Sequence, residues 1–352
     1  MDANISKPDQ EKRSWKFAKN HGGIVFVLIT FGWSWLFWLA CILLRGREDL
    51  LLTAVVLIGG YGPAVGAILT SRLQSDHRNP FTIKRAIAFM LGFILIFGLM
   101  VLRHRAGNLQ DFNLLAEDLS LSLPILLSAV AASLVGGWVI SFSVSDNPEL
   151  KTRFKSILPW KASFLWTLFG LFFYPTLILI AWGLGSLVGL GVEYPGLWGE
   201  PLRQSLHLYA LIFGLTAVAQ GGNEEPGWRG FMQPELQKRF SPLVAALIVS
   251  LFWSLWHLPL YLNGFYPGDL VGGIIGGAVF RVFLSIFLAW VYFKSKGNLF
   301  AIILLHTSFN VMVNFLPTSD AGLTMLWMLV SIAAVVEGKM WRKRLADKDL
   351  ES

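Results

Sequence analysis

The sequence contains little charge and a single cysteine. Asp, Glu, Lys and Arg make up 14% of its 352 residues, which excludes an ordinary soluble domain. One cysteine excludes a framework of internal disulfides, and because Cys41 lies within an apolar run we do not expect it to be a thiol nucleophile. The sequence has neither an internal repeat nor a Gly-rich phosphate loop with its lysine, so transport driven by nucleotide is not supported.

Apolar residues dominate instead: 55% of the chain is hydrophobic. About ten runs approach the ~20 residues needed to cross a bilayer. They lie near residues 24–44, 51–70, 86–102, 119–142, 164–190, 206 onward, 242–258, 270–293, 299–315 and 323–336. The pattern predicts an all-α fold, a polytopic membrane helical bundle of about ten transmembrane helices.

The basic residues indicate the orientation of this bundle. Most Lys and Arg lie in alternate connections and in both tails, so the net charge of +7 predicts contact with membrane lipids and no nucleic-acid partner. The positive-inside rule then places the N- and C-termini in the cytosol. We expect an integral, multi-pass protein of the plasma membrane.

Ionisable residues enter the apolar runs only after about residue 200. An ionisable group at membrane depth costs several kcal/mol and by default indicates a functional site. We therefore expect any chemistry in the C-terminal part of the chain, at Glu224, Glu225, Arg229, His257, Arg281 and His306.

The two adjacent glutamates are expected to have different partners. Glu225 and Arg229 are four residues apart, so on a helix they share a face and are expected to pair. Glu224 points about 100° away and has no cation at helical spacing. Pro226 and Gly227 follow directly and predict a kink in the helix. The kink would free backbone polar groups, and only a polar cavity or a neighbouring helix could satisfy their hydrogen bonds.

Counting residues from a predicted turn places a histidine at the same depth as Glu224. A turn is predicted near residues 240–241, with Glu224 about 16 residues before it and His257 about 16 residues after it. An antiparallel helical hairpin therefore places both residues at one depth. His306 and Asn310 share one face of a later apolar run. Each histidine alone has a structural interpretation, in an aromatic belt or as an interhelical hydrogen bond. Together these groups predict one polar cavity.

These residues resemble a known family. The segment from Glu224 to Arg229 resembles the EExxxR motif, Trp253 to His257 resembles FxxxH, and His306 to Asn310 resembles HxxxN of the CPBP intramembrane proteases, which include the type II CAAX prenyl endopeptidases. Trp253 stands where the family usually has Phe. The resemblance implies a protease core at residues 201–316, preceded by a cytosolic tail (1–22) and N-terminal helices of unknown role (23–200), and followed by a last helix with a basic tail (317–352).

Peptide hydrolysis needs an activated water and a stabilised oxyanion. Glu224 is the candidate general base, with His257 helping to hold the water. Alternatively, Glu224, His257 and His306 bind Zn²⁺ and leave one position open for water. The sequence does not choose between a glutamate-type enzyme and a metalloendopeptidase. Asn310, with His306, is the candidate oxyanion donor.

Further residues support or extend this site. Glu225 and Arg229 are expected to hold the kinked helix, and Trp253 to form an aromatic wall. For Arg281, the favoured interpretation is pairing with a carboxylate such as Glu225. The alternative is that Arg281 binds the C-terminal carboxylate of a substrate.

The resemblance implies an intramembrane endopeptidase acting on membrane-associated substrates, such as prenylated CAAX-type C-termini. Two alternatives remain open at this stage. One is a non-catalytic immunity or scaffold protein that binds a peptide partner in the same cavity. The other is an ion-coupled transporter, which we rank last because the chain lacks the paired interrupted helices of inverted repeats.

Overall fold

The computed structural model describes residues 16–44, 50–77, 80–105, 123–154, 157–158, 163–195, 202–266 and 269–343. Most of the predicted cytosolic tail, the extreme C-terminus and several connections used for the orientation argument lie outside these ranges. Throughout the described ranges the chain is helical, apart from turns and one isolated bridge between Glu193 and Thr318.

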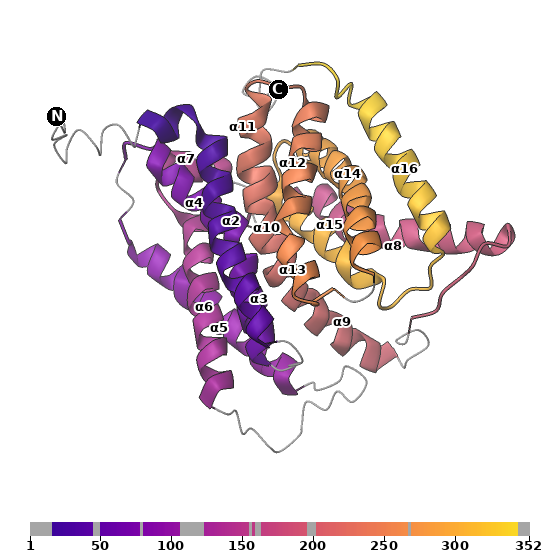
Figure 1. Ribbon diagram of the computed structural model, residues 1–352, viewed down its shortest axis with the longest axis horizontal. Coiled ribbons are helices and arrows are strands. Elements are labelled where there is room, and N and C mark those ends of the chain that lie inside the picture. The colour runs from indigo at the N-terminus through magenta and orange to yellow at the C-terminus, as the bar shows by residue number, and fades with distance from the viewer. Residues whose placement is uncertain are drawn as a thin grey trace.

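In the described part of the first half of the chain, the helices run from α2 to α8 (Figure 1). They are α2 (Gly22–Ala40), α3 (Leu50–Gly60), α4 (Gly62–Gln74), α5 (Ile83–Arg105), α6 (Leu123–Ser141), the short α7 (Pro148–Arg153) and α8 (Phe164–Leu187). The second half supplies α9 (Leu202–Thr216), α10 (Gly222–Gly227), α11 (Gln233–Gln237), α12 (Pro242–Trp256), α13 (Leu258–Leu262), α14 (Leu270–Lys294), α15 (Leu299–Met312) and α16 (Asp320–Glu337).

The all-α membrane bundle predicted from the sequence is confirmed. Within the described ranges, eight helices are long and apolar enough to cross a membrane, rather than about ten. The two remaining predicted runs differ for physical reasons. The run from residue 206 is divided among α9, α10 and α11, and α15 has 14 residues, or about 21 Å, which is shorter than a bilayer core.

The segments α9, α10 and α11 cross the centre of the molecule (Figure 1). Helices α2 to α7 lie to one side, and α12 and α14 to α16 lie to the other, where α8 packs on α15 and α16. Helix α10 contacts both α4 and α15. The segment that carries Glu224 is therefore held between the two groups of helices.

The backbone around Glu224 departs from regular α-helix where we expected a kink. π-helical segments at Ala217–Gly221 and Trp228–Met232 flank α10, and Pro226 lies inside α10. Proline has no N–H to donate, and π segments of this kind are frequent at functional sites. A Cβ at Gly227 would lie 2.4 Å from Cβ of Pro63, so only glycine allows α10 this close to α4.

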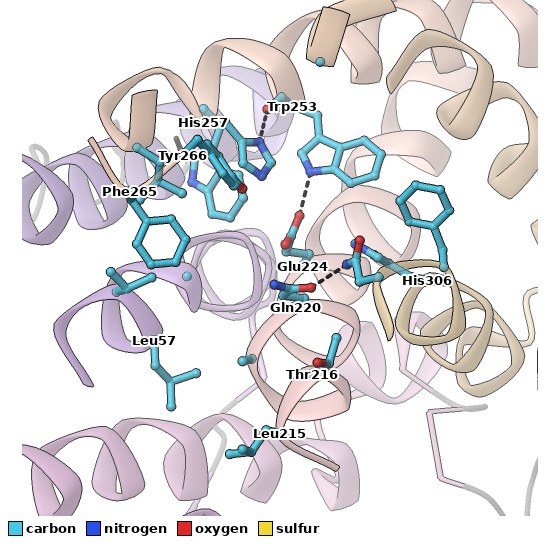
Figure 2. A pocket seen from close by; sticks show the side chains of 18 of the residues that line it. Leu57, Leu215, Thr216, Gln220, Glu224, Trp253, His257, Phe265, Tyr266 and His306 are labelled. Carbon is cyan, nitrogen blue, oxygen red and sulfur yellow. Dashed lines mark hydrogen bonds between the residues drawn. The ribbon is translucent and has the colours of Figure 1, made fainter. Parts of the chain in front are cut away.

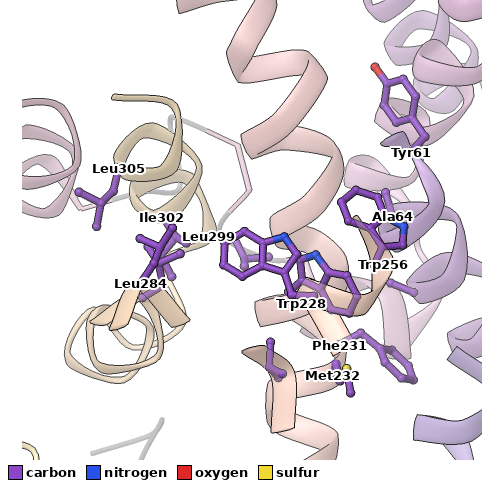
Figure 3. Packing of buried hydrophobic residues seen from close by; sticks show 14 of the residues in the cluster. Tyr61, Ala64, Trp228, Phe231, Met232, Trp256, Leu284, Leu299, Ile302 and Leu305 are labelled. Carbon is purple, nitrogen blue, oxygen red and sulfur yellow. The ribbon is translucent and has the colours of Figure 1, made fainter. Parts of the chain in front are cut away.

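Large apolar side chains fix the opposite face of this segment (Figure 3). Trp228 and Phe231 are fully buried, and Trp228 meets Trp256 edge-on at 5.8 Å between ring centroids. Phe231 stacks on Phe26 of α2 at 5.1 Å. Because aromatic rings bury large areas in specific geometries, this packing sets the rotation of the segment and with it the direction of Glu224.

Candidate active site

A cavity of about 680 Å³ lies beside the central segment (Figure 2). Six of the residues singled out in the sequence line it: Glu224, Trp253, His257, Arg281, His306 and Asn310. Its volume is typical of sites that bind a small ligand or a short peptide segment. The polar cavity predicted from depth counting is thus present.

The N-terminal helices, for which the sequence indicated no role, form another wall of the cavity. Helices α2, α3 and α5 contribute mainly apolar residues: Trp38, Val56, Leu57, Gly60, Met100 and Arg103. Leu57 lies well apart from the polar cluster around Glu224 (Figure 2). The cavity therefore has a polar end and a more apolar end.

Glu224 is held by Trp253. The indole Nε1–H of Trp253 donates a hydrogen bond of 2.6 Å to Oε2 of Glu224, which is 4% exposed (Figure 2). This contact joins α10 to α12 one turn before His257, so the two limbs of the hairpin meet at the expected depth. The other carboxylate oxygen has no donor among the residues that the structure describes, and it remains an acceptor for water or substrate.

His257 ends α12 with a fixed ring orientation. Its Nδ1 lies 2.8 Å from the carbonyl oxygen of Trp253. Because a carbonyl only accepts, Nδ1 carries the proton and donates, which leaves Nε2 of the neutral ring as an acceptor. Trp256 supports the ring edge-on at 4.7 Å. His257 can therefore accept a hydrogen bond from a water in the cavity.

Glu225 belongs to a second, fully buried cluster. Its Oε1 accepts from Arg229 Nη1 at 3.2 Å, which confirms the predicted pair, and from His306 Nδ1 at 2.6 Å. Both Glu225 and Arg229 are 0% exposed. This cluster ties α10 to α15, and it orients His306 through one ring nitrogen while leaving the other free.

Asn310 is oriented by a residue that the sequence interpretation missed. Its Nδ2 donates to Oε1 of Gln220, which also lines the cavity (Figure 2). An amide nitrogen carries two hydrogens, so one remains for a ligand. Gln220 lies four residues before Glu224, and a polar residue at that spacing in an apolar run was the available signal.

Arg281 makes no ion pair with Glu225 in the described structure. The carboxylate of Glu225 is already engaged by Arg229 and His306, and Arg281 donates instead to the hydroxyl of Tyr261 at 3.4 Å. Arg281 lies on the cavity wall. Counting along the chain gave its helix but could not show which way the side chain points.

The three predicted zinc ligands do not form a metal-binding cluster. Among the described residues, no three His, Cys, Asp or Glu side chains are grouped so that they could hold a metal ion. This arrangement does not fit Zn²⁺, and we derive no step through it.

The indole of Trp253 makes a contact that the usual Phe of the family motif cannot make. Trp253→Phe keeps a ring beneath the Arg229 guanidinium, which lies 4.6 Å from the ring centroid, but removes the donor to Glu224. We expect turnover by a Glu224-dependent reaction to fall about tenfold to a hundredfold, since a hydrogen bond to a charged group contributes roughly 1.5–3 kcal/mol. Steady-state kinetics of the purified variant measure this.

Trp290→Phe is the matched control for that variant. It removes an indole hydrogen bond of 2.6 Å to Glu337 at the protein surface, away from the cavity. Turnover should then match the wild type. Equal activity of Trp253→Phe and Trp290→Phe would show that the Trp253 donor does not position Glu224.

Comparison with known proteins agrees with this geometry. Residues 206–312 match the family model described as type II CAAX prenyl endopeptidase Rce1-like. CAAX prenyl protease 2 of Methanococcus maripaludis is 30% identical over 132 residues, which are 35% of this chain and 48% of the relative. The chain thus matches about half the length of that curated relative. No solved structure matches the chain.

Fold and site together define an integral, multi-pass helical membrane protein with a buried Glu–His–Asn cavity. Over residues 206–312 the chain is similar to the CPBP family, which includes the type II CAAX prenyl endopeptidases. The family predicted from the three motifs is confirmed.

Proposed function

We propose that this protein is an intramembrane endopeptidase that hydrolyses peptide bonds of membrane-associated substrates, including prenylated CAAX-type C-termini. One observation carries the proposal: a single cavity collects Glu224, His257, His306 and Asn310 from the three family motifs. These side chains supply a base, an acceptor for water and amide donors, which is what peptide hydrolysis needs.

In the proposed reaction, a water lies between Glu224 and Nε2 of His257. Glu224 removes a proton from this water as the oxygen attacks the substrate carbonyl carbon. The resulting oxyanion is stabilised by the free amide hydrogen of Asn310, beside His306. As the C–N bond breaks, Glu224 returns the proton to the leaving amine, so the cycle regenerates the carboxylate.

The apolar end of the cavity supports a lipid-modified substrate. Val56, Leu57, Met100 and Leu215 are among the apolar residues that line the cavity. An isoprenoid chain placed there would bury apolar surface while the peptide lies at Glu224. For the site to process cytosolic C-termini, the basic connections and both termini are proposed to face the cytosol, at the plasma membrane.

Incubation of the detergent-purified protein with a prenylated CAAX peptide and with a library of membrane-segment peptides tests the proposal. We expect mass spectrometry to find a cleaved product that disappears with Glu224→Gln. Parallel reactions with a chelator, and with Zn²⁺ added back, show whether a metal takes part. Absence of any Glu224-dependent product would instead favour the non-catalytic protein that binds a peptide partner in this cavity.

Asn310→Ala tests the oxyanion donor separately. The variant removes the amide that Gln220 orients, and we expect kcat to fall about 10²- to 10³-fold with little change in KM. A donor that acts only in the transition state affects turnover rather than substrate binding. Initial rates over a range of peptide concentrations separate the two parameters. A change in KM alone would assign Asn310 to substrate binding.

A further inference from the structure

Arg281 is a cation on the cavity wall. The ion pairs of the described chain do not include it. Its side chain is half-buried in α14, a helix long and apolar enough to cross a membrane. Since a cation without an ion pair at this depth is costly, an anion supplied by a bound substrate would stabilise it.

The surroundings of Arg281 hold the side chain in place. Nη1 donates to the hydroxyl of Tyr261 at 3.4 Å, and the ring of Tyr266 packs against the ring of Tyr261. A Cβ at Gly277 would lie 2.3 Å from the Tyr261 hydroxyl and 2.8 Å from Nη1 of Arg281. Glycine one turn before Arg281 thus leaves the space in which these two groups meet.

This cluster adjoins the proposed catalytic groups. Tyr261 and Tyr266 have ring centroids 4.9 Å apart, and Tyr266 lies 6.2 Å from the ring of His257. Arg281 also interacts electrostatically with Glu224 and His257, although it makes no ion pair with Glu224. An anion bound at Arg281 would therefore lie in the same cavity as the reacting bond without displacing Glu224.

We propose that Arg281, supported by Tyr261 and Tyr266, binds the free C-terminal carboxylate of the peptide substrate. The proposal rests on the proposed function and deepens it. A guanidinium has five N–H donors, so the bond to Tyr261 leaves enough for a two-point contact with a carboxylate. The cavity also contains Glu224, whose charge would repel a substrate carboxylate that had no cation to receive it.

An anchored carboxylate also fixes where the chain is cut. Each extended residue spans at most about 3.6 Å, so the separation between Arg281 and the water at Glu224 admits a set number of residues. The enzyme should then release a short C-terminal peptide of one length. It should discriminate against substrates whose C-terminus carries no charge.

Two peptides of identical sequence, one with a free C-terminal acid and one with a C-terminal amide, test this site. For the wild type we expect kcat/KM for the acid to exceed that for the amide about tenfold to a hundredfold. Arg281→Gln should bring this ratio close to one, and Arg281→Lys, which keeps the charge but not the fork, should give an intermediate ratio. Because each variant is compared with itself, partial loss of folded protein does not affect the ratio.

Lys294→Gln is the control on the same helix. It removes a cation that pairs with Glu337 at the other end of α14, and it should keep the wild-type ratio. Tyr261→Phe should lower the ratio, because Arg281 loses a supporting hydroxyl. Equal cleavage of acid and amide by the wild type, or an unchanged ratio in Arg281→Gln, would overturn the carboxylate site while leaving the peptidase in place.

A binding measurement separates this inference from the proposed function. If no peptide is cleaved in a Glu224-dependent way, fluorescence polarisation of the labelled acid and amide peptides still reports on Arg281. Tighter binding of the acid, lost in Arg281→Gln, would support the carboxylate site in a protein that only binds. Equal binding of the two peptides would overturn it.

Discussion

Glu224→Gln is expected to lower peptide cleavage by about 10²- to 10⁴-fold, the usual contribution of a general base, while the folded protein stays as stable as the wild type. The amide has nearly the shape of the carboxylate, and its oxygen can still accept from Trp253. What is lost is the ability to take a proton from water. His257→Ala should reduce cleavage as well, because it removes the second contact to that water.

Activity and thermal unfolding of the same detergent preparation check this prediction. Glu337→Gln changes a surface carboxylate in the same way and should leave activity and thermal unfolding unchanged. The reason is that Glu337 is bonded to Trp290 and Lys294 outside the cavity. If Glu224→Gln unfolded well below the wild type, the loss of activity would not identify Glu224 as the base. Retention of cleavage would exclude that role.

Local spacing predicted those parts of the site that depend on one helix or one hairpin. The separation of four residues gave the Glu225–Arg229 pair, and equal depth gave the meeting of α10 with α12. Both follow from the rise and periodicity of the α-helix, which a sequence shows directly. The π segments around α10 did not disturb the result, since Glu224 still reaches the level of Trp253.

Contacts between distant helices were not accessible in this way. His306 bonds to Glu225 rather than lying free beside Glu224, and this depends on how α15 packs against α10. The donor role of Trp253 depends on a rotamer, and the wall formed by α2, α3 and α5 depends on tertiary packing. Arg281 shows the limit most clearly: its place on α14 was predictable, whereas its partner Tyr261 comes from a different helix, α13.

The buried cluster behind the cavity gives the largest expected effect on stability. Glu225→Gln leaves Arg229 fully buried without a counter-ion, which should lower the free energy of unfolding by about 3–5 kcal/mol. Glu224→Gln removes a carboxylate that has no ion-pair partner in the described chain, so its cost should be far smaller. Thermal unfolding of the two single variants in one detergent compares the neighbours directly.

The double variant Glu225→Gln/Arg229→Met separates charge pairing from positioning. With both charges gone, the buried pair is replaced by groups that need no counter-ion, and much of the lost stability should return. Peptidase activity should not return, because His306 no longer donates to a carboxylate at 2.6 Å and its ring is free to turn. A stable and fully active double variant would show that Glu225 serves only to neutralise Arg229. A single variant as stable as the wild type would exclude a buried ion pair at this position.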